Sequence, residues 1–156
     1  MTARTLYRLV SIAEAVTWTL LIAGMILKYV TRTTDALVSV GGALHGFAFL
    51  LFVVSTVVTA INARWRAGQW ALGLGSAVIP WATLAFDAWA ERRGLLPEHW
   101  RLRPGGDEPT GPAERLLAWV LAHPLLAAIL TLVAVSLVFS TLLWLGPPTG
   151  WGERFS

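Results

Sequence analysis

Four long apolar stretches dominate the sequence, and the first three each carry an ionisable side chain well inside: Glu14, His45 and Asp87. An acid or base in the middle of a membrane helix costs on the order of 2.5 kcal/mol or more, so such a group is usually paired, turned inward or used. Each stretch has the roughly 20 residues that an α-helix needs to cross a bilayer. The pattern indicates a membrane protein whose few polar groups share one interior.

The composition supports this class of protein. Only 13% of the residues are charged and 56% are hydrophobic, whereas a soluble domain has about a quarter charged residues. Backbone groups in lipid must bond within their own segment, and no period-two alternation is present, so we predict helices. The predicted fold class is all-α, a polytopic membrane helical bundle with four transmembrane helices.

Composition also excludes several functions. The chain has no cysteine, which excludes disulfides and thiol chemistry. The net charge of +3 is small, and the basic residues flank the apolar stretches instead of forming one block, so we expect no nucleic-acid partner.

The chain divides into three predicted parts. Residues 1–93 form a three-helix membrane core, with helices expected at 6–30, 36–62 and 69–90. Residues 94–112 are rich in Pro, Gly and charge, which indicates a solvent-exposed loop. Residues 113–156 supply a short interfacial helix, a fourth transmembrane helix and a short tail. Pro124 suits the first turn of a helix, so we expect the interfacial helix at 112–122 and the fourth span at 124–145.

Orientation is weakly determined by the basic residues, because arginine and lysine flank both ends of the four predicted spans in nearly equal number. We expect a multi-pass protein of the plasma membrane with both termini in the cytoplasm.

A polar seam is predicted between the first three helices. Its members are Glu14, Lys28, His45, Ser76, Thr83 and Asp87. Helical spacing places Glu14 and Lys28 on one face of the first helix. At about 1.5 Å per residue, Lys28 and Asp87 lie near the same membrane surface, which predicts an ion pair. By the same measure Glu14 lies level with Ser76.

Small residues suggest where the helices approach one another. Gly42 and Gly46 flank His45 in a small-xxx-small pattern, and Pro80 shares the polar face of the third helix. We predict that these three residues serve helix packing. His45 then fits an interhelical hydrogen bond, whereas Glu14 is equally compatible with a structural and a functional role.

The sequence lacks the residues that a metal site, a haem site or a hydrolase site needs. A metal site requires several convergent donors, and Glu14 and His45 are expected about 12 Å apart in depth. A haem held by His45 and His123 is disfavoured, because His123 precedes a proline near the interface. No nucleophile and base lie at matching depth. We therefore expect no catalytic residue, no metal and no cofactor.

The order of these groups resembles a known family. Glu14, Lys28-Tyr29, Gly42-x-x-His45-Gly46 and Pro80-x-x-Thr83-x-x-Phe86-Asp87 are similar to the pattern of the YdzA-like family of small bacterial integral membrane proteins, a domain of unknown function. The resemblance covers residues 8–93. It implies a three-helix core in the plasma membrane and carries no established activity.

Two functions remain open from the sequence. The first is a non-enzymatic accessory or interaction subunit, whose partners are the lipid bilayer and other membrane-protein subunits or a second copy. The alternative is an oligomeric transporter or proton-conducting unit in which Glu14, His45 and Asp87 take protons in turn. A dry seam saturated with hydrogen bonds favours the first, and a wet, continuous seam favours the second.

Overall fold

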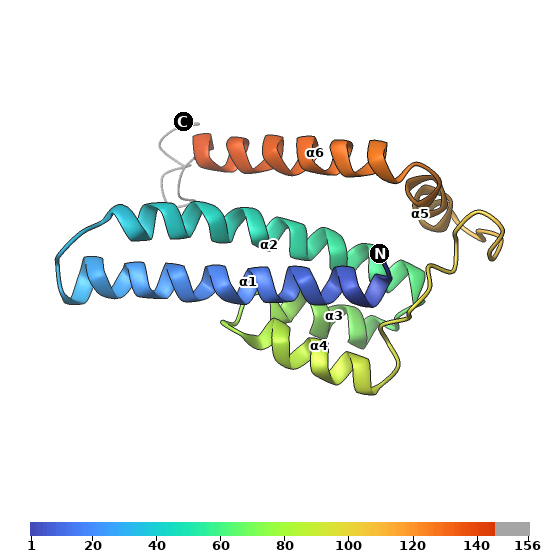
Figure 1. Ribbon diagram of the computed structural model, residues 1–156, viewed down its shortest axis with the longest axis horizontal. Coiled ribbons are helices and arrows are strands. Elements are labelled where there is room, and N and C mark those ends of the chain that lie inside the picture. Colours follow the sequence, from blue (N-terminus) through green and yellow to red (C-terminus); the bar gives the residue numbers. More distant parts are fainter. Residues whose placement is uncertain (146–156) are drawn as a thin grey trace, which may run out of the picture.

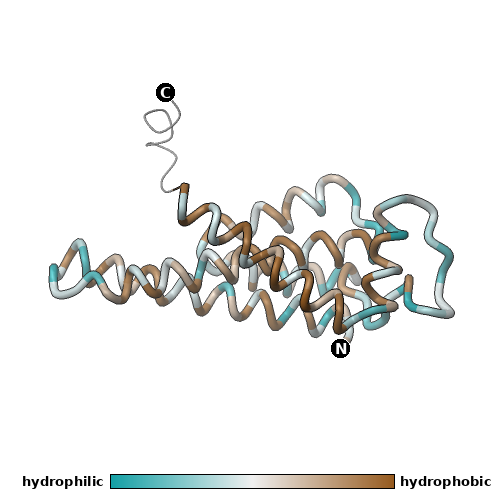
Figure 2. The backbone as a smooth tube through the Cα atoms, turned by 90° about the horizontal axis from the view of Figure 1, so that it is seen from above, coloured by the Kyte–Doolittle hydropathy of each residue, from teal (hydrophilic) through white to brown (hydrophobic). Residues whose placement is uncertain are grey.

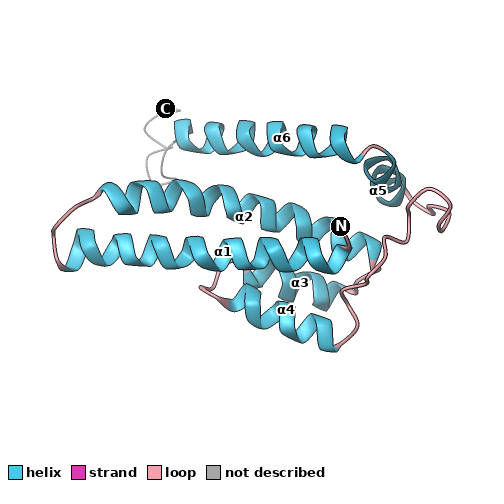
Figure 3. Cartoon of the chain, viewed as in Figure 1, coloured by secondary structure: helices cyan, strands magenta, loops and turns pink. Residues whose placement is uncertain are grey.

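The computed structural model describes residues 1–145, which form six α-helices and a π-helical turn without any β-strand among them (Figures 1 and 3). The elements are α1 (Ala3–Met25), η1 (Ile26–Val30), α2 (Ala36–Asn62), α3 (Ala67–Ser76), α4 (Ala82–Arg92), α5 (Pro112–Ala122) and α6 (Pro124–Leu145). The all-α prediction is confirmed. The predicted tail, 146–156, lies outside the described residues.

Three of these helices are long and apolar enough to cross a membrane. They are α1 continued by η1, with 28 residues, α2 with 27 and α6 with 22. At about 1.5 Å per residue each exceeds the roughly 30 Å of bilayer hydrocarbon. Figure 2 shows hydrophobic residues along these helices and hydrophilic residues gathered in the loops at the two ends. The described part of the chain therefore has three candidate spans, one fewer than predicted.

The predicted third span is instead two short helices. Proline has no N–H and clashes with the carbonyl four residues earlier, so Pro80 breaks the helix that ends at Ser76. It also disfavours a helical conformation at Ile79. Trp81 then takes a left-handed conformation, with φ at 61°, and α4 begins after it. Pro80 thus lies in a turn rather than in a packed helix.

The two short helices form a hairpin in which α4 packs against α1 and α3 packs against α2 (Figure 1). The indole Nε1 of Trp81 donates to the Thr19 hydroxyl at 3.0 Å, and Asp87, farther along α4, binds Arg8. Residue numbers therefore rise along α4 as they fall along α1. The hairpin enters and leaves at the end of the bundle where α1 begins, and its tip reaches the level of Thr19.

An aromatic core joins the hairpin to the long helices. The ring centroid of Tyr7 lies 5.4 Å from that of Phe52, 6.1 Å from Trp65 and 6.2 Å from Phe86. Gly73 lets α3 approach this core, because a Cβ there would lie 2.9 Å from Cζ3 of Trp65. Burial of these large side chains holds the hairpin in place.

The closest approach of α1 and α2 occurs at two glycines. A Cβ on Gly24 would lie 2.5 Å from the backbone nitrogen of Val38, and one on Gly41 would lie 3.1 Å from the carbonyl carbon of Leu20. These contacts are with backbone atoms, which cannot move aside as a side chain can. They set the antiparallel register of the two helices.

The glycines predicted to serve packing behave differently. A Cβ on Gly42 would meet Leu21 Cδ1 at an ordinary 3.7 Å, so this position is not tight. A Cβ on Gly46 would lie 2.9 Å from the ring of Phe139 on α6. Gly46 therefore makes room for the last helix, and the close approach of α1 to α2 takes place elsewhere.

A charged cluster ties the 93–111 loop and α5 to the end of α2. Glu114 accepts hydrogen bonds from the Thr110 backbone N–H at 2.9 Å, from Arg101 at 2.6 Å and from Arg64 at 3.2 Å. The Thr110 bond and then the Arg101 bond lower the pKa of Glu114 from 4.5 to about 2. Figure 1 shows α5 running across the end of the bundle rather than along it.

Candidate functional site

Glu14 lies at the centre of the polar groups that the fold brings together. Its side chain is fully buried between α1, α2 and α4, and its Oε2 accepts a hydrogen bond from the Thr83 hydroxyl at 2.7 Å. Thr83 is also fully buried, 3.5 Å from the backbone oxygen of Ser11. Ser76, which was predicted to lie level with Glu14, donates to the carbonyl of Gly73 in its own helix at 2.7 Å.

Several polar atoms buried on α1, α2 and α4 make no well-formed hydrogen bond within the described residues, although Trp18 is a side-chain partner of Glu14 and Thr56 of Tyr7. We call this cluster the polar interior, and its atoms are Tyr7 Oη, Ser11 Oγ, Glu14 Oε1, Trp18 Nε1, Thr56 Oγ1, Thr59 Oγ1 and Asp87 Oδ1. Nearly all buried polar groups in proteins bond to protein or to ordered water. Groups of this kind on three facing helices are therefore suited to bind water or a small polar ligand.

His45, on α2, lies level with Thr17, which is one helical turn after Glu14 on α1. Its Nδ1 is 3.3 Å from the Thr17 hydroxyl, which donates to the Glu14 backbone oxygen at 2.9 Å. The imidazole also packs on Trp18, with ring centroids 4.2 Å apart. Three residues rise about 4.5 Å along a helix, so the expected separation of about 12 Å was too large. The prediction counted depth from the end of each helix. It did not include the register of α1 against α2, which the close approach at Gly24 imposes.

Asp87 pairs with an arginine instead of the predicted lysine. Its Oδ2 accepts from Arg8 Nε at 3.1 Å, and the same guanidinium binds Glu91. Lys28 lies at the opposite end of the bundle, where it is exposed and its Nζ stands 5.6 Å from the Tyr29 ring centroid. The predicted Lys28–Asp87 pair was wrong because the hairpin returns α4 to the beginning of α1.

Arg8 is the residue that the sequence analysis missed. Asp87 and Glu91 are four residues apart and share one helical face, so a cation opposite them is expected. With α4 placed antiparallel to α1, Arg8 is the basic residue that reaches both carboxylates. When the third segment is treated as one continuous span, Asp87 is placed at the opposite membrane surface, beside Lys28.

The arrangement places hydrogen-bonding and ionisable groups side by side on α1, α2 and α4. Glu14, Thr17 and His45 lie within one turn, and the Arg8–Asp87 pair lies toward the end of the bundle. Within residues 1–145, three or more His, Asp or Glu side chains do not converge on a point that could hold a metal ion.

The chain is similar to known proteins over the helices that carry these residues. A family model described as "Domain of unknown function (DUF3817)" matches residues 4–92, the segment from α1 to α4. A protein of Streptomyces coelicolor described as a membrane protein is 44% identical over 105 residues. The match covers 67% of this chain but 12% of that protein. No solved structure matches the chain.

Proposed function

This chain belongs to the DUF3817 family, and we propose that it is a non-enzymatic accessory or interaction subunit of a larger membrane complex. One observation carries the proposal: in the Streptomyces relative the related segment makes up 12% of a far longer membrane protein. In the relative this segment is covalently part of a large polypeptide. The same segment as a separate chain is therefore suited to bind a large membrane polypeptide.

The last helix supplies a surface for such a contact. Helix α6 lies beyond the residues matched to the family, and it buries Ala127 and Val135 while most of its other side chains are exposed. Phe139 anchors it to α2 at Gly46 and, edge to face, to Phe47 at 6.3 Å. Its outer apolar face is available to another membrane protein or to a second copy of this chain.

Photo-crosslinking at single positions of α6 tests this role. A crosslinking amino acid at Leu137, which is 64% exposed, should form an adduct with another membrane polypeptide in cells. The same amino acid at Val135, which is 5% exposed, is the matched control and should not. An uncrosslinked monomer at Leu137, together with a monomer on native gels, would contradict the proposal.

Orientation follows from the hairpin if positive residues face the cytoplasm. With both ends of the hairpin beside the start of α1, that end carries the larger group of basic residues: Arg4, Arg8, Arg64, Arg66, Arg92, Arg93, Arg101, Arg103 and Arg115. The opposite end has Lys28 and Arg32 among the described residues. This asymmetry supports a cytoplasmic N-terminus and an external end of α6. Two cytoplasmic termini were expected on the assumption of four crossings.

A second candidate function is proton handling by Glu14, His45 and Asp87. The observation that favours it is the fully buried carboxyl of Glu14, which belongs to the polar interior on the facing sides of α1, α2 and α4. Intramembrane acids of this kind mark proton relays in pumps and transporters. An oligomer would have to complete the path beyond His45, since α1 and α2 are in close backbone contact there at Leu20 and Gly41.

Proton flux into liposomes separates the two functions. Glu14→Gln keeps the shape of the side chain, so we expect it to preserve expression and fold while abolishing any flux. Lys28→Gln, at an exposed residue outside the polar interior, is the matched control. Flux that is unaffected by Glu14→Gln would rule out proton handling through this site.

A further inference from the structure

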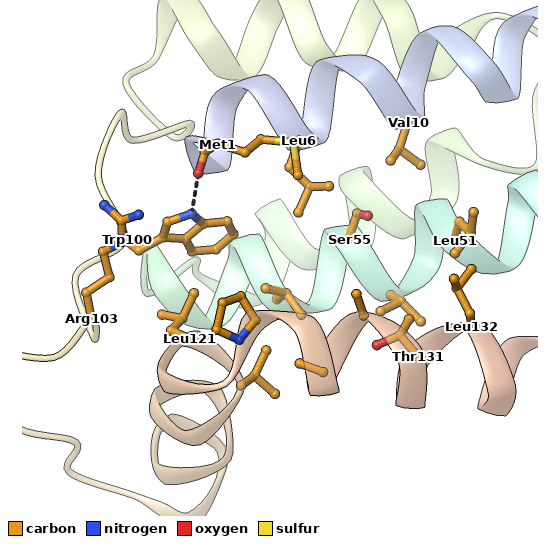
Figure 4. Close-up of a pocket in the computed structure, with 16 residues that line it drawn as sticks. Met1, Leu6, Val10, Leu51, Ser55, Trp100, Arg103, Leu121, Thr131 and Leu132 are labelled. Carbon is orange, nitrogen blue, oxygen red and sulfur yellow. Dashed lines mark hydrogen bonds between the residues drawn. The ribbon is translucent and has the colours of Figure 1, made fainter.

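An apolar cavity lies between α6 and the pair α1 and α2 (Figure 4). Its volume is about 610 Å³, which is within the range of small-molecule binding sites. Side chains such as Leu6 and Val10 of α1, Leu51 of α2 and Leu132 of α6 form its walls. The cavity exists because α6 contacts α2 closely at Phe139 and stands farther away near its beginning (Figure 1).

One end of the cavity carries an indole and a guanidinium, whereas the rest is apolar apart from the hydroxyls of Ser55 and Thr131. At the end near the 93–111 loop, the Trp100 indole Nε1 donates to the backbone oxygen of Met1 at 3.0 Å, and Arg103 lies beside it (Figure 4). Arg4 and Arg101 at the same end each pair with a carboxylate, whereas Arg103 has no ion pair among the described residues. A buried indole and an unneutralised guanidinium therefore mark the mouth of an apolar groove.

The groove is slightly shorter than one leaflet of a bilayer. Along α6 it extends from Pro124 to Leu132, eight residues that rise about 12 Å. Half of the hydrocarbon core is about 15 Å thick. Tryptophan and arginine are the side chains expected at the level of the lipid headgroups, which places the mouth at the membrane interface and the groove in the acyl layer.

We propose that this cavity binds an acyl chain of an anionic phospholipid, with the lipid phosphate held at Arg103. The charge of Arg103 favours an anionic headgroup. The phosphate of an anionic lipid has no positive group of its own and can pair with the guanidinium. The phosphate of a zwitterionic lipid is already neutralised by the positive group of the same headgroup. Basic pockets between transmembrane helices bind anionic headgroups in this way. The proposal goes beyond the accessory role and does not depend on it.

Native mass spectrometry of the purified protein with defined lipids tests the proposal. The wild type should retain one phosphatidylglycerol, with an affinity about fivefold higher than for phosphatidylcholine, the gain expected from one basic residue near a membrane surface. Arg103→Gln should remove that preference, and Arg103→Lys should keep most of it. Equal binding of the two lipids by the wild type would overturn the headgroup assignment.

A substitution that fills the cavity tests the acyl-chain part of the proposal. Ala128→Phe places a ring in the groove and should weaken binding of both lipids, while Ala134→Phe, on an exposed part of α6 outside the cavity, should not. Circular dichroism confirms that each variant is folded. Lipid binding unchanged by Ala128→Phe, or a bound polypeptide in place of lipid, would overturn the proposal.

Discussion

Arg8 and Asp87 are 79 residues apart in sequence, yet Arg8 Nε lies 3.1 Å from Asp87 Oδ2. The Asp87 side chain is 8% exposed, and Glu91, one turn later, binds the same guanidinium. This contact joins the end of α4 to the beginning of α1. It therefore determines which way the hairpin points and which polar groups meet inside the bundle.

Loss of the arginine should destabilise the fold. Arg8→Gln leaves the Asp87 carboxylate buried without its counter-charge, a change that costs roughly 1–3 kcal/mol. The loss is measurable as a lower midpoint of thermal unfolding in detergent, followed by circular dichroism. Adding Asp87→Asn to Arg8→Gln should recover part of the stability, because the buried group is then neutral.

Arg115→Gln is the control for this pair, since Arg115 is exposed and has no ion pair among the described residues. It removes the same charge from the same end of the bundle. A thermal midpoint for Arg8→Gln equal to that of Arg115→Gln would show that the contact contributes nothing to stability.

The hairpin makes a direct prediction about membrane sidedness. The chain has no cysteine, so single substitutions can be labelled without background. Gly68→Cys at the start of α3 and Arg93→Cys after α4 should react with a membrane-impermeant maleimide from the same side. Thr33→Cys, between η1 and α2, should react from the opposite side.

Labelling in intact cells and in inverted vesicles gives the two readouts. A continuous third span would place Gly68→Cys and Arg93→Cys on opposite sides, and this result would contradict the hairpin. Reaction of Thr33→Cys from outside the cell would further support the proposed cytoplasmic N-terminus.

Local signals explain how much of the fold the sequence could predict. The predicted bounds of α2, α5 and α6 agree with the structure to the residue, because apolar length and Pro112 and Pro124 mark them. The break before Pro80 was also a local signal. The sequence analysis instead assigned Pro80 to helix packing within one continuous span, a position that transmembrane helices tolerate when neighbours satisfy the freed backbone groups.

Pairing within the site could not be predicted in the same way. Placing Glu14, Thr83 and Asp87 on the inner faces required only helical periodicity, and the structure buries all three. Which partner each one meets depends on the direction of α4 and on the register of α1 against α2. Both are set by non-local contacts, such as Arg8 with Asp87, that depth along a single helix does not reveal.

Two glycines on facing helices test the α1–α2 interface. Gly24→Ala would place a Cβ 2.5 Å from the Val38 backbone nitrogen, so the helices must separate. We expect a loss of about 1–3 kcal/mol, the usual cost of overpacking, seen as a lower thermal midpoint. Gly42→Ala is the matched control, because its Cβ would make an ordinary 3.7 Å contact with Leu21. Equal midpoints for the two variants would refute the assigned register.

The anchor of the 93–111 loop should respond to acid. Bonds from Thr110 and Arg101 hold the pKa of Glu114 at about 2, below its ordinary 4.5. A depressed pKa in the folded state means that the anchor contributes fully above pH 4.5 and is lost as the pH falls toward 2. A spin label on Pro104→Cys should therefore be equally restrained from pH 8 to pH 5 and become mobile only in stronger acid.

Glu114→Gln separates this carboxylate from its neighbours. The amide cannot carry the charge that Arg101 and Arg64 bind, so the spin label should already be mobile at pH 7 and change little in acid. Asp107 also pairs with Arg101, at 3.4 Å, and keeps its carboxylate in this variant. A transition that persists in Glu114→Gln would therefore show that the acid response does not arise from Glu114 and remove Glu114 as the anchor.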